Sequence, residues 1–240
     1  EMLPQYEPVF NVFQVPYDAF NELFIRHRNV IFTQISPKYS QSRFLIERDR
    51  YARQQVFIYL QAADDSAFVS LLRSNGNKII NYLNRAERER ILNLHLRNLD
   101  SRIQERIIKK HNVSLVIPKG YKIERDSADF TWVNQEIGDI IQGIMIYHYP
   151  FHDSTDFRLK QLIAMRDKFV KKYMPGEIEG SYMTTEKMIE PLYKEYLFKG
   201  KRYVVEIRGL WKVEKGISMG GPFISLSTLD SKNQRILTIE

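Results

Sequence analysis

The chain has 240 residues, of which 43% are hydrophobic and 27% are charged, a composition typical of globular rather than disordered proteins. It contains no cysteine, which excludes disulfides, thiolate metal sites and cysteine nucleophiles. The net charge of +7 is a mild excess and indicates a solvated surface rather than a nucleic-acid partner. The longest apolar stretch, Ile140–Tyr149, is interrupted by polar residues, so we expect no transmembrane span.

The first 62 or so residues favour short strands, because apolar and β-branched residues gather in brief runs between turn residues. A helix is expected from Asp18 to about Arg28, with Phe20, Leu23 and Phe24 on one face. The expected strands are Phe10–Val15, Asn29–Ile35, Arg43–Glu47 and Gln55–Gln61.

Two helices are expected next. The cluster Asp64-Asp65-Ser66 is a helix N-cap signal, and Asn75-Gly76 is a helix stop signal. A long helix then covers Lys78–Lys110, which contains no proline or glycine. Its expected buried stripe consists of Leu92, Leu96, Leu99, Ile103 and Ile107.

The C-terminal half favours strands joined by short turns, which suits antiparallel pairing. One helix interrupts them, capped by Asp153-Ser154-Thr155 and running to about Tyr173. The expected strands are Val113–Ile117, Tyr121–Arg125, Phe130–Asn134, Gly143–Tyr149, Pro191–Phe198, Tyr203–Val213, Pro222–Ser227 and Arg235–Ile239.

Strands in runs with inserted helices predict an α+β fold, with antiparallel sheets, helices packed on one side and one long helix. We expect two subdomains, 1–111 and 112–240, with a seam near Lys110–Ile117, or else one continuous domain.

No catalytic, cofactor or metal constellation survives inspection. His148 and His152 flank a proline, and too few further ligands lie nearby for a zinc site. The carboxylate pairs Glu136/Asp139 and Glu177/Glu179 would be an acid and base only inside a cleft, and turn positions are the simpler interpretation. Gly216, Gly220 and Gly221 precede a strand rather than a helix, so they predict a bulge or hairpin and not a phosphate loop.

The stretch Arg208–Phe223 stands out because it combines an arginine, a tryptophan and glycines between two expected strands. Arg208 is either a clamp for an anionic ligand or the partner of an internal acid. The tryptophans are either ligand contacts or core aromatics. The candidate ligand or partner surface consists of Arg208, Trp211, Trp132, Met219 and Phe223.

Six blocks in this order resemble an uncharacterised domain-of-unknown-function family of lipoproteins from the Bacteroidetes. The blocks are Ile117–Tyr121, Phe130–Trp132, Gln142–Tyr147, Gly180–Thr185, Arg208–Trp211 and Met219–Phe223. The resemblance implies a periplasmic or outer-membrane location, with a signal peptide and a lipidated cysteine that the printed sequence does not contain. It implies no catalytic residue and no cofactor.

The leading hypothesis is a non-enzymatic cell-envelope module that binds a partner protein or a glycan, or has a structural role. One alternative is a glycan-directed hydrolase that uses a carboxylate pair. Another is a polyanion-binding protein that uses the basic long helix.

Overall fold

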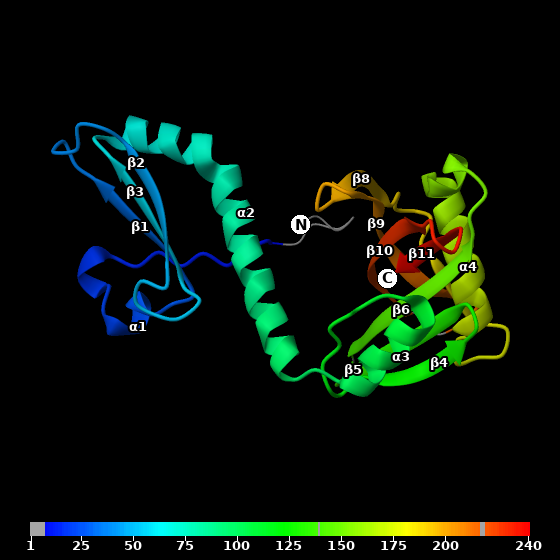
Figure 1. Cartoon of the computed structure of the whole chain (residues 1–240). Coiled ribbons are helices and arrows are strands. Elements are labelled where there is room, and N and C mark those ends of the chain that lie inside the picture. The colour runs from blue at the N-terminus through cyan, green and yellow to red at the C-terminus, as the bar shows by residue number, and fades with distance from the viewer. Residues whose placement is uncertain (1–7, 139, 217–218) are drawn as a thin grey trace. The chain divides into compact units, whose positions relative to one another are not determined.

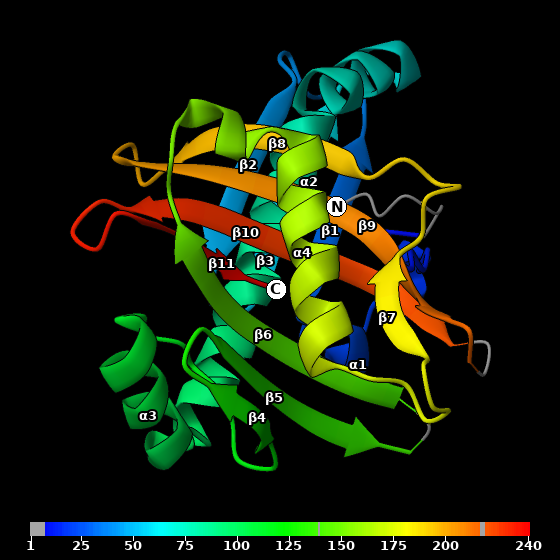
Figure 2. The same ribbon diagram turned by 90° about the vertical axis from the view of Figure 1, so that its right-hand side faces the viewer.

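The computed structural model describes residues 8–138, 140–216 and 219–240, and Figures 1 and 2 show its helices and strands from two directions. The chain divides into an N-terminal unit, Val12–Leu99, and a C-terminal unit, Asp100–Glu240, which also takes in the described residues up to Asn11. The predicted α+β class, with antiparallel strands and one long helix, is confirmed. Among the described residues, no helix has the length and apolar character needed to cross a membrane.

The N-terminal unit is a three-stranded sheet packed against a long helix. Strand β3 (Val56–Ala62) lies between β1 (Asn29–Ile35), which is parallel to it, and β2 (Arg43–Arg48), which is antiparallel. Helix α2 (Asp65–Arg97) contacts β3 and buries Ile79, Leu83 and Ala86.

The segment before β1 differs from its prediction. The expected strand Phe10–Val15 is wrong, because this segment pairs with no described strand and leaves Phe13 85% exposed. Apolar residues form a strand only when a neighbouring strand satisfies the backbone. The expected helix from Asp18 shortens to a 3₁₀ turn (Tyr17–Ala19) and α1 (Glu22–Ile25). Asn21 starts the latter by accepting a hydrogen bond from the Leu23 amide at 3.0 Å.

The predicted helix stop at Asn75-Gly76 is also wrong. The Asn75 side chain donates to the Leu71 carbonyl at 2.9 Å, and Gly76 continues α2 with a helical backbone. The chain breaks instead before Asp100, whose carboxylate accepts from the Arg102 and Ile103 amides at 3.1 Å and caps a new helix. Helix α2 therefore continues past the glycine, and the boundary between the two helices lies instead where the Asp100 side chain caps the second one.

This break divides the predicted buried stripe between two helices. Leu92 and Leu96 lie on α2 and are 48% and 49% exposed, so their predicted burial is wrong. Ile103 and Ile107 lie on α3 (Ser101–His111) and are buried against the C-terminal unit. The structure accordingly divides the chain between Leu99 and Asp100, before the predicted seam at Lys110–Ile117.

The C-terminal unit is an eight-stranded antiparallel sheet in the order β4-β5-β6-β11-β10-β9-β7, with β8 also paired to β9. Its strands are β4 (Lys122–Ser127), β5 (Phe130–Ile137), β6 (Ile140–Pro150), β7 (Tyr182–Thr185), β8 (Leu192–Phe198), β9 (Arg202–Glu214), β10 (Gly220–Asp230) and β11 (Arg235–Ile239). Strand β7 was not predicted. Val113–Ile117 was predicted as a strand and is not one, although Ile117 is fully buried.

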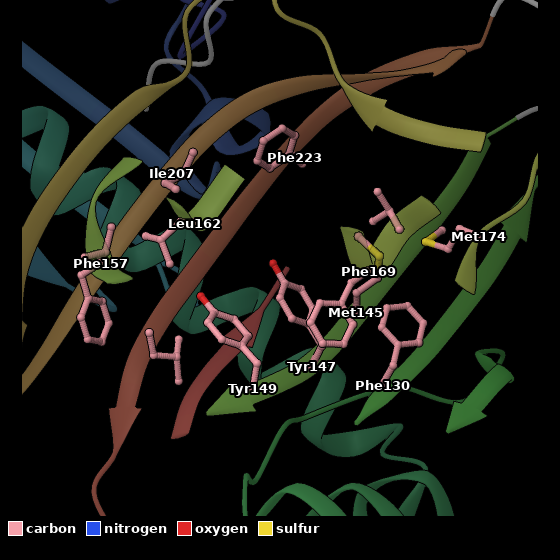
Figure 3. Packing of buried hydrophobic residues seen from close by; sticks show 13 residues of the cluster. Phe130, Met145, Tyr147, Tyr149, Phe157, Leu162, Phe169, Met174, Ile207 and Phe223 are labelled. Carbon is pink, nitrogen blue, oxygen red and sulfur yellow. The ribbon is translucent and has the colours of Figure 1, made fainter. Parts of the chain in front are cut away.

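Helices cover both faces of this sheet rather than the one expected. Helix α4 (Leu159–Tyr173), preceded by the 3₁₀ turn Ser154–Phe157, lies across the strands in Figure 2. Beneath α4, the Tyr147 and Phe169 rings stack at 4.6 Å within an aromatic core that also holds Phe130 (Figure 3). On the other face, α3 packs against β5, β6 and β11.

One charged side chain is buried inside this core. Arg166 of α4 is 1% exposed, and its Nε and Nη2 each donate to a carboxylate oxygen of Glu240 at 2.7 Å. Its Nη1 donates to the Thr185 hydroxyl at 3.1 Å, and its guanidinium lies 3.9 Å from the centre of the Phe223 ring. The charge is therefore paired, hydrogen-bonded and stacked at once, which a buried guanidinium requires.

We predict that Arg166→Ala lowers the free energy of unfolding by about 3–5 kcal/mol, because it leaves the Glu240 carboxylate buried without its partner. Urea denaturation of the purified protein measures this loss. Lys160→Ala, an exposed position on the same helix, is the control and should change stability by less than about 0.5 kcal/mol. The double variant Arg166→Met with Glu240→Met should recover most of the loss. A loss below about 1 kcal/mol for Arg166→Ala would contradict the assigned role.

Candidate functional site

The predicted surface does not form one site. Residues two apart on a strand share a face, so Trp211 on β9 and Phe223 on β10 face α4, while Arg208 faces the opposite side. Trp132 on β5 also packs against the core beneath α4, and Phe223 is buried there. Met219 lies at the β9–β10 connection and is partly exposed. These side chains are therefore not gathered around one ligand position.

Arg208 and the tryptophans have structural surroundings. Arg208 Nε donates to Glu206 at 2.6 Å, which agrees with the internal-acid alternative. Gly143 and Gly221 give the tryptophans room, because a Cβ at either glycine would lie 3.0 Å from the indole nitrogen of Trp132 or Trp211 respectively. These glycines serve close packing, and Gly221 lies at the start of β10 in the predicted hairpin with β9.

The described residues of the predicted carboxylate pairs are exposed and do not line the groove along α4. Glu136 is exposed near the end of β5, and Asp139 lies outside the described residues. Glu177 and Glu179 are exposed in the connection between α4 and β7. In the part of the chain that the structure describes, no three His, Asp or Glu side chains come together as a metal site.

A groove of about 950 Å³ runs along α4 within the C-terminal unit. One wall is a single helix face, because its residues recur at spacings of three and four: Gln161, Ala164, Met165, Lys168, Phe169 and Lys172. The other wall is the end of the sheet, where the β4–β5 turn, the last residues of β6 and the β10–β11 turn meet. The pairs Phe130–Tyr147 and Pro150–Arg235 bring these strand ends together.

The floor of the groove is aromatic, and one of its residues, Tyr149, has a buried hydroxyl. Phe169 and Tyr149 both line the groove and belong to the core shown in Figure 3. Tyr149 is only 8% exposed, and its hydroxyl has no hydrogen-bond partner among the described residues. Burial, with a smaller contribution from the negative charge of Asp156, raises the pKa of Tyr149 above its usual range. The phenol therefore stays neutral.

The acids and bases of the groove differ in how they are partnered. Asp129 accepts a hydrogen bond from the Tyr173 hydroxyl at 2.5 Å, and Asp156 accepts from the amide and Nδ1 of His152 at 2.8 and 3.1 Å. Lys168 has neither an acid nor a hydrogen-bond partner among the described residues, and Lys172 lies over the Tyr173 ring at 4.5 Å. The carboxylates are thus engaged internally, whereas the lysines are not paired with an acid.

Two histidines with lowered pKa values, His111 and His148, lie at the groove wall, and His148 is one of its lining residues. His111 is fully buried, with its Nε2 2.8 Å from the Thr131 hydroxyl and its ring 5.6 Å from that of His148. Burial, followed by the positive charge of Lys110, lowers the pKa of His111 to about 4, and burial also lowers that of His148. His148 and Arg235 also disfavour the protonation of His111, and Asp126 favours it.

Because the pKa of His111 is lower in the folded state than in the unfolded state, we predict that acid destabilises the fold through this residue. Its contribution is fully present above about pH 6.5 and is lost as the pH falls from 6.5 to about 4, by about 3 kcal/mol. Urea denaturation at several pH values measures the slope. His111→Gln should flatten it between pH 6 and 4, whereas the exposed His152→Gln should leave it unchanged. An unchanged slope in His111→Gln would refute the assignment.

Comparison with known families follows the division of the chain. Residues 1–95 match a family model described as "Domain of unknown function (DUF8532)". A search of curated proteins finds no match. Residues 100–240 match the model described as "Domain of unknown function (DUF4837)", which covers the α4 groove and more than half of the chain. The expected membership of an uncharacterised family is confirmed, and the chain belongs to the DUF4837 family.

Proposed function

We propose that this protein is a non-enzymatic binding module of the cell envelope, and that the groove along α4 is its ligand site. The observation that supports this proposal is the composition of the groove, which combines an aromatic floor of Phe169 and Tyr149 with two lysines, Lys168 and Lys172, that have no acid partner among the described residues. Concave sites with an apolar floor and a few polar groups are the usual form of ligand pockets.

The groove also bears on the hydrolase alternative, since two carboxylates, Asp129 and Asp156, line it. A glycosidase needs one carboxyl group free to protonate the leaving oxygen and another free to attack or to activate water. Both carboxylates here already accept hydrogen bonds from neighbouring side chains. This arrangement favours binding over hydrolysis.

The basic residues of α2 give little support to polyanion binding. Arg90 is buried and bonded to Glu87 at 2.6 Å, and Arg85 lies within 3.9 Å of Glu89. Paired charges of alternating sign contribute weakly to the long-range attraction of a polyanion. The α4 groove therefore remains the better supported site.

We predict that the neutral fluorescent probe N-phenyl-1-naphthylamine binds the groove, because its floor is aromatic. Fluorescence titration of the full chain measures binding. Ala164→Trp, an exposed groove position, should abolish most of the signal by filling the groove. Lys171→Trp, an exposed position on α4 outside the groove, is the matched control and should bind normally. Equal binding by both variants would show that the probe does not occupy the groove.

The envelope location is supported by the resemblance of the six sequence blocks to Bacteroidetes lipoproteins. We predict that the natural gene product, followed with an antibody in the cells that produce it, fractionates with the outer membrane and incorporates radiolabelled palmitate. Treatment with a signal-peptidase inhibitor specific for lipoproteins is the control and should stop its maturation. Recovery in the cytosol without palmitate would refute the location and leave the groove assignment untouched.

A further inference from the structure

Resting on the proposed function, we propose that the α4 groove selects a small amphiphile with one anionic head group, a carboxylate or a phosphate. The head group would lie between the ammonium groups of Lys168 and Lys172, and the apolar part would lie along the floor.

The first observation is the spacing of the two lysines. Lys168 and Lys172 are four residues apart on α4, so they project from the same helix face, and both line the groove. Like charges at this spacing destabilise a helix by about 0.2–0.5 kcal/mol. No carboxylate of the described residues lies within ion-pair distance of either. An anion bound between them would remove this repulsion and gain charge-assisted hydrogen bonds.

The lysines could simply complement the helix dipole, and Lys171 separates the two explanations. Lys171 lies in the same last turn of α4 and complements the dipole as well as Lys172 does. Its ammonium lies 4.2 Å from the centre of the Tyr182 ring, and the residue does not line the groove. The dipole therefore accounts for all lysines of this turn alike, whereas an anion site requires only those in the groove.

The rest of the groove determines the kind of anion. The lining combines Met165, Phe169 and Ala164 of α4 with the buried ring of Tyr149, which favours an apolar chain. The two carboxylates of the groove, Asp129 and Asp156, already accept hydrogen bonds from Tyr173 and His152, whereas neither lysine has an acid partner among the described residues. Carboxylates and phosphates share the oxygen acceptors that two ammonium groups can satisfy.

The test is displacement of N-phenyl-1-naphthylamine from the full chain by four competitors: octanoate, octyl phosphate, neutral octyl glucoside below its micelle concentration, and inorganic phosphate. In the wild type, octanoate or octyl phosphate should compete at about tenfold lower concentration than octyl glucoside. The variant Lys168→Met with Lys172→Met should lose this advantage. Lys171→Met, which removes an equal charge from the same turn, should retain it.

Each of the remaining outcomes overturns or changes the inference. The inference is overturned if the charged competitors have no advantage, or if the double variant keeps that advantage. In either case, probe binding that Ala164→Trp blocks still supports the groove. Competition by inorganic phosphate as strong as that by octyl phosphate would replace the amphiphile with a free anion. If the probe does not bind at all, the proposed function fails its own test. Calorimetry with octyl phosphate then decides the inference directly, and absence of binding overturns it.

Discussion

The C-terminal unit depends on satisfying the buried guanidinium of Arg166. Its partners come from separate parts of the chain: Thr185 from β7, Phe223 from β10, and Glu240 directly after β11. A charge in this position would cost several kcal/mol if any arrangement left it unpaired. Because these partners surround one position on α4, the contact helps to position the helix on the sheet, together with the apolar core.

That placement also creates the groove. Arg166, Phe169 and Val170 bury one part of α4 against the sheet, and the adjacent face, with Lys168 and Lys172, then lies beside the strand ends. Contacts of Arg235 also fix the groove wall. Arg235 donates to the His111 carbonyl at 3.0 Å and to Asp230 at 2.8 Å, which connects α3 to the β10–β11 turn. The candidate site is thus a consequence of core packing on both faces of the sheet.

Local patterns predicted most elements of the fold and failed where the decisive partner was distant in sequence. The strand-like runs Tyr203–Val213 and Arg235–Ile239 correctly indicated β9 and β11, because both strands are embedded in the sheet. Phe10–Val15 carries a similar pattern but pairs with no described strand. Strand β7 was missed because Tyr182–Thr185 is short, and its pairing with β9 sets its conformation.

The sequence by itself determined the α+β class, the antiparallel character of the C-terminal sheet and the absence of cysteine chemistry, since composition, short-range periodicity and short connections are sufficient for these. The parallel pairing of β1 with β3 was decided by the tertiary structure. The tertiary structure alone decided which polar side chains meet. Trp132, Trp211 and Phe223 were conspicuous in the sequence, yet they pack in or against the core. Lys168 and Lys172 were explained by the helix dipole and were not predicted as ligand contacts, because no sequence signal records that this face of α4 lies beside the end of β6. Burial and pairing depend on contacts between distant segments, and those exist only after folding.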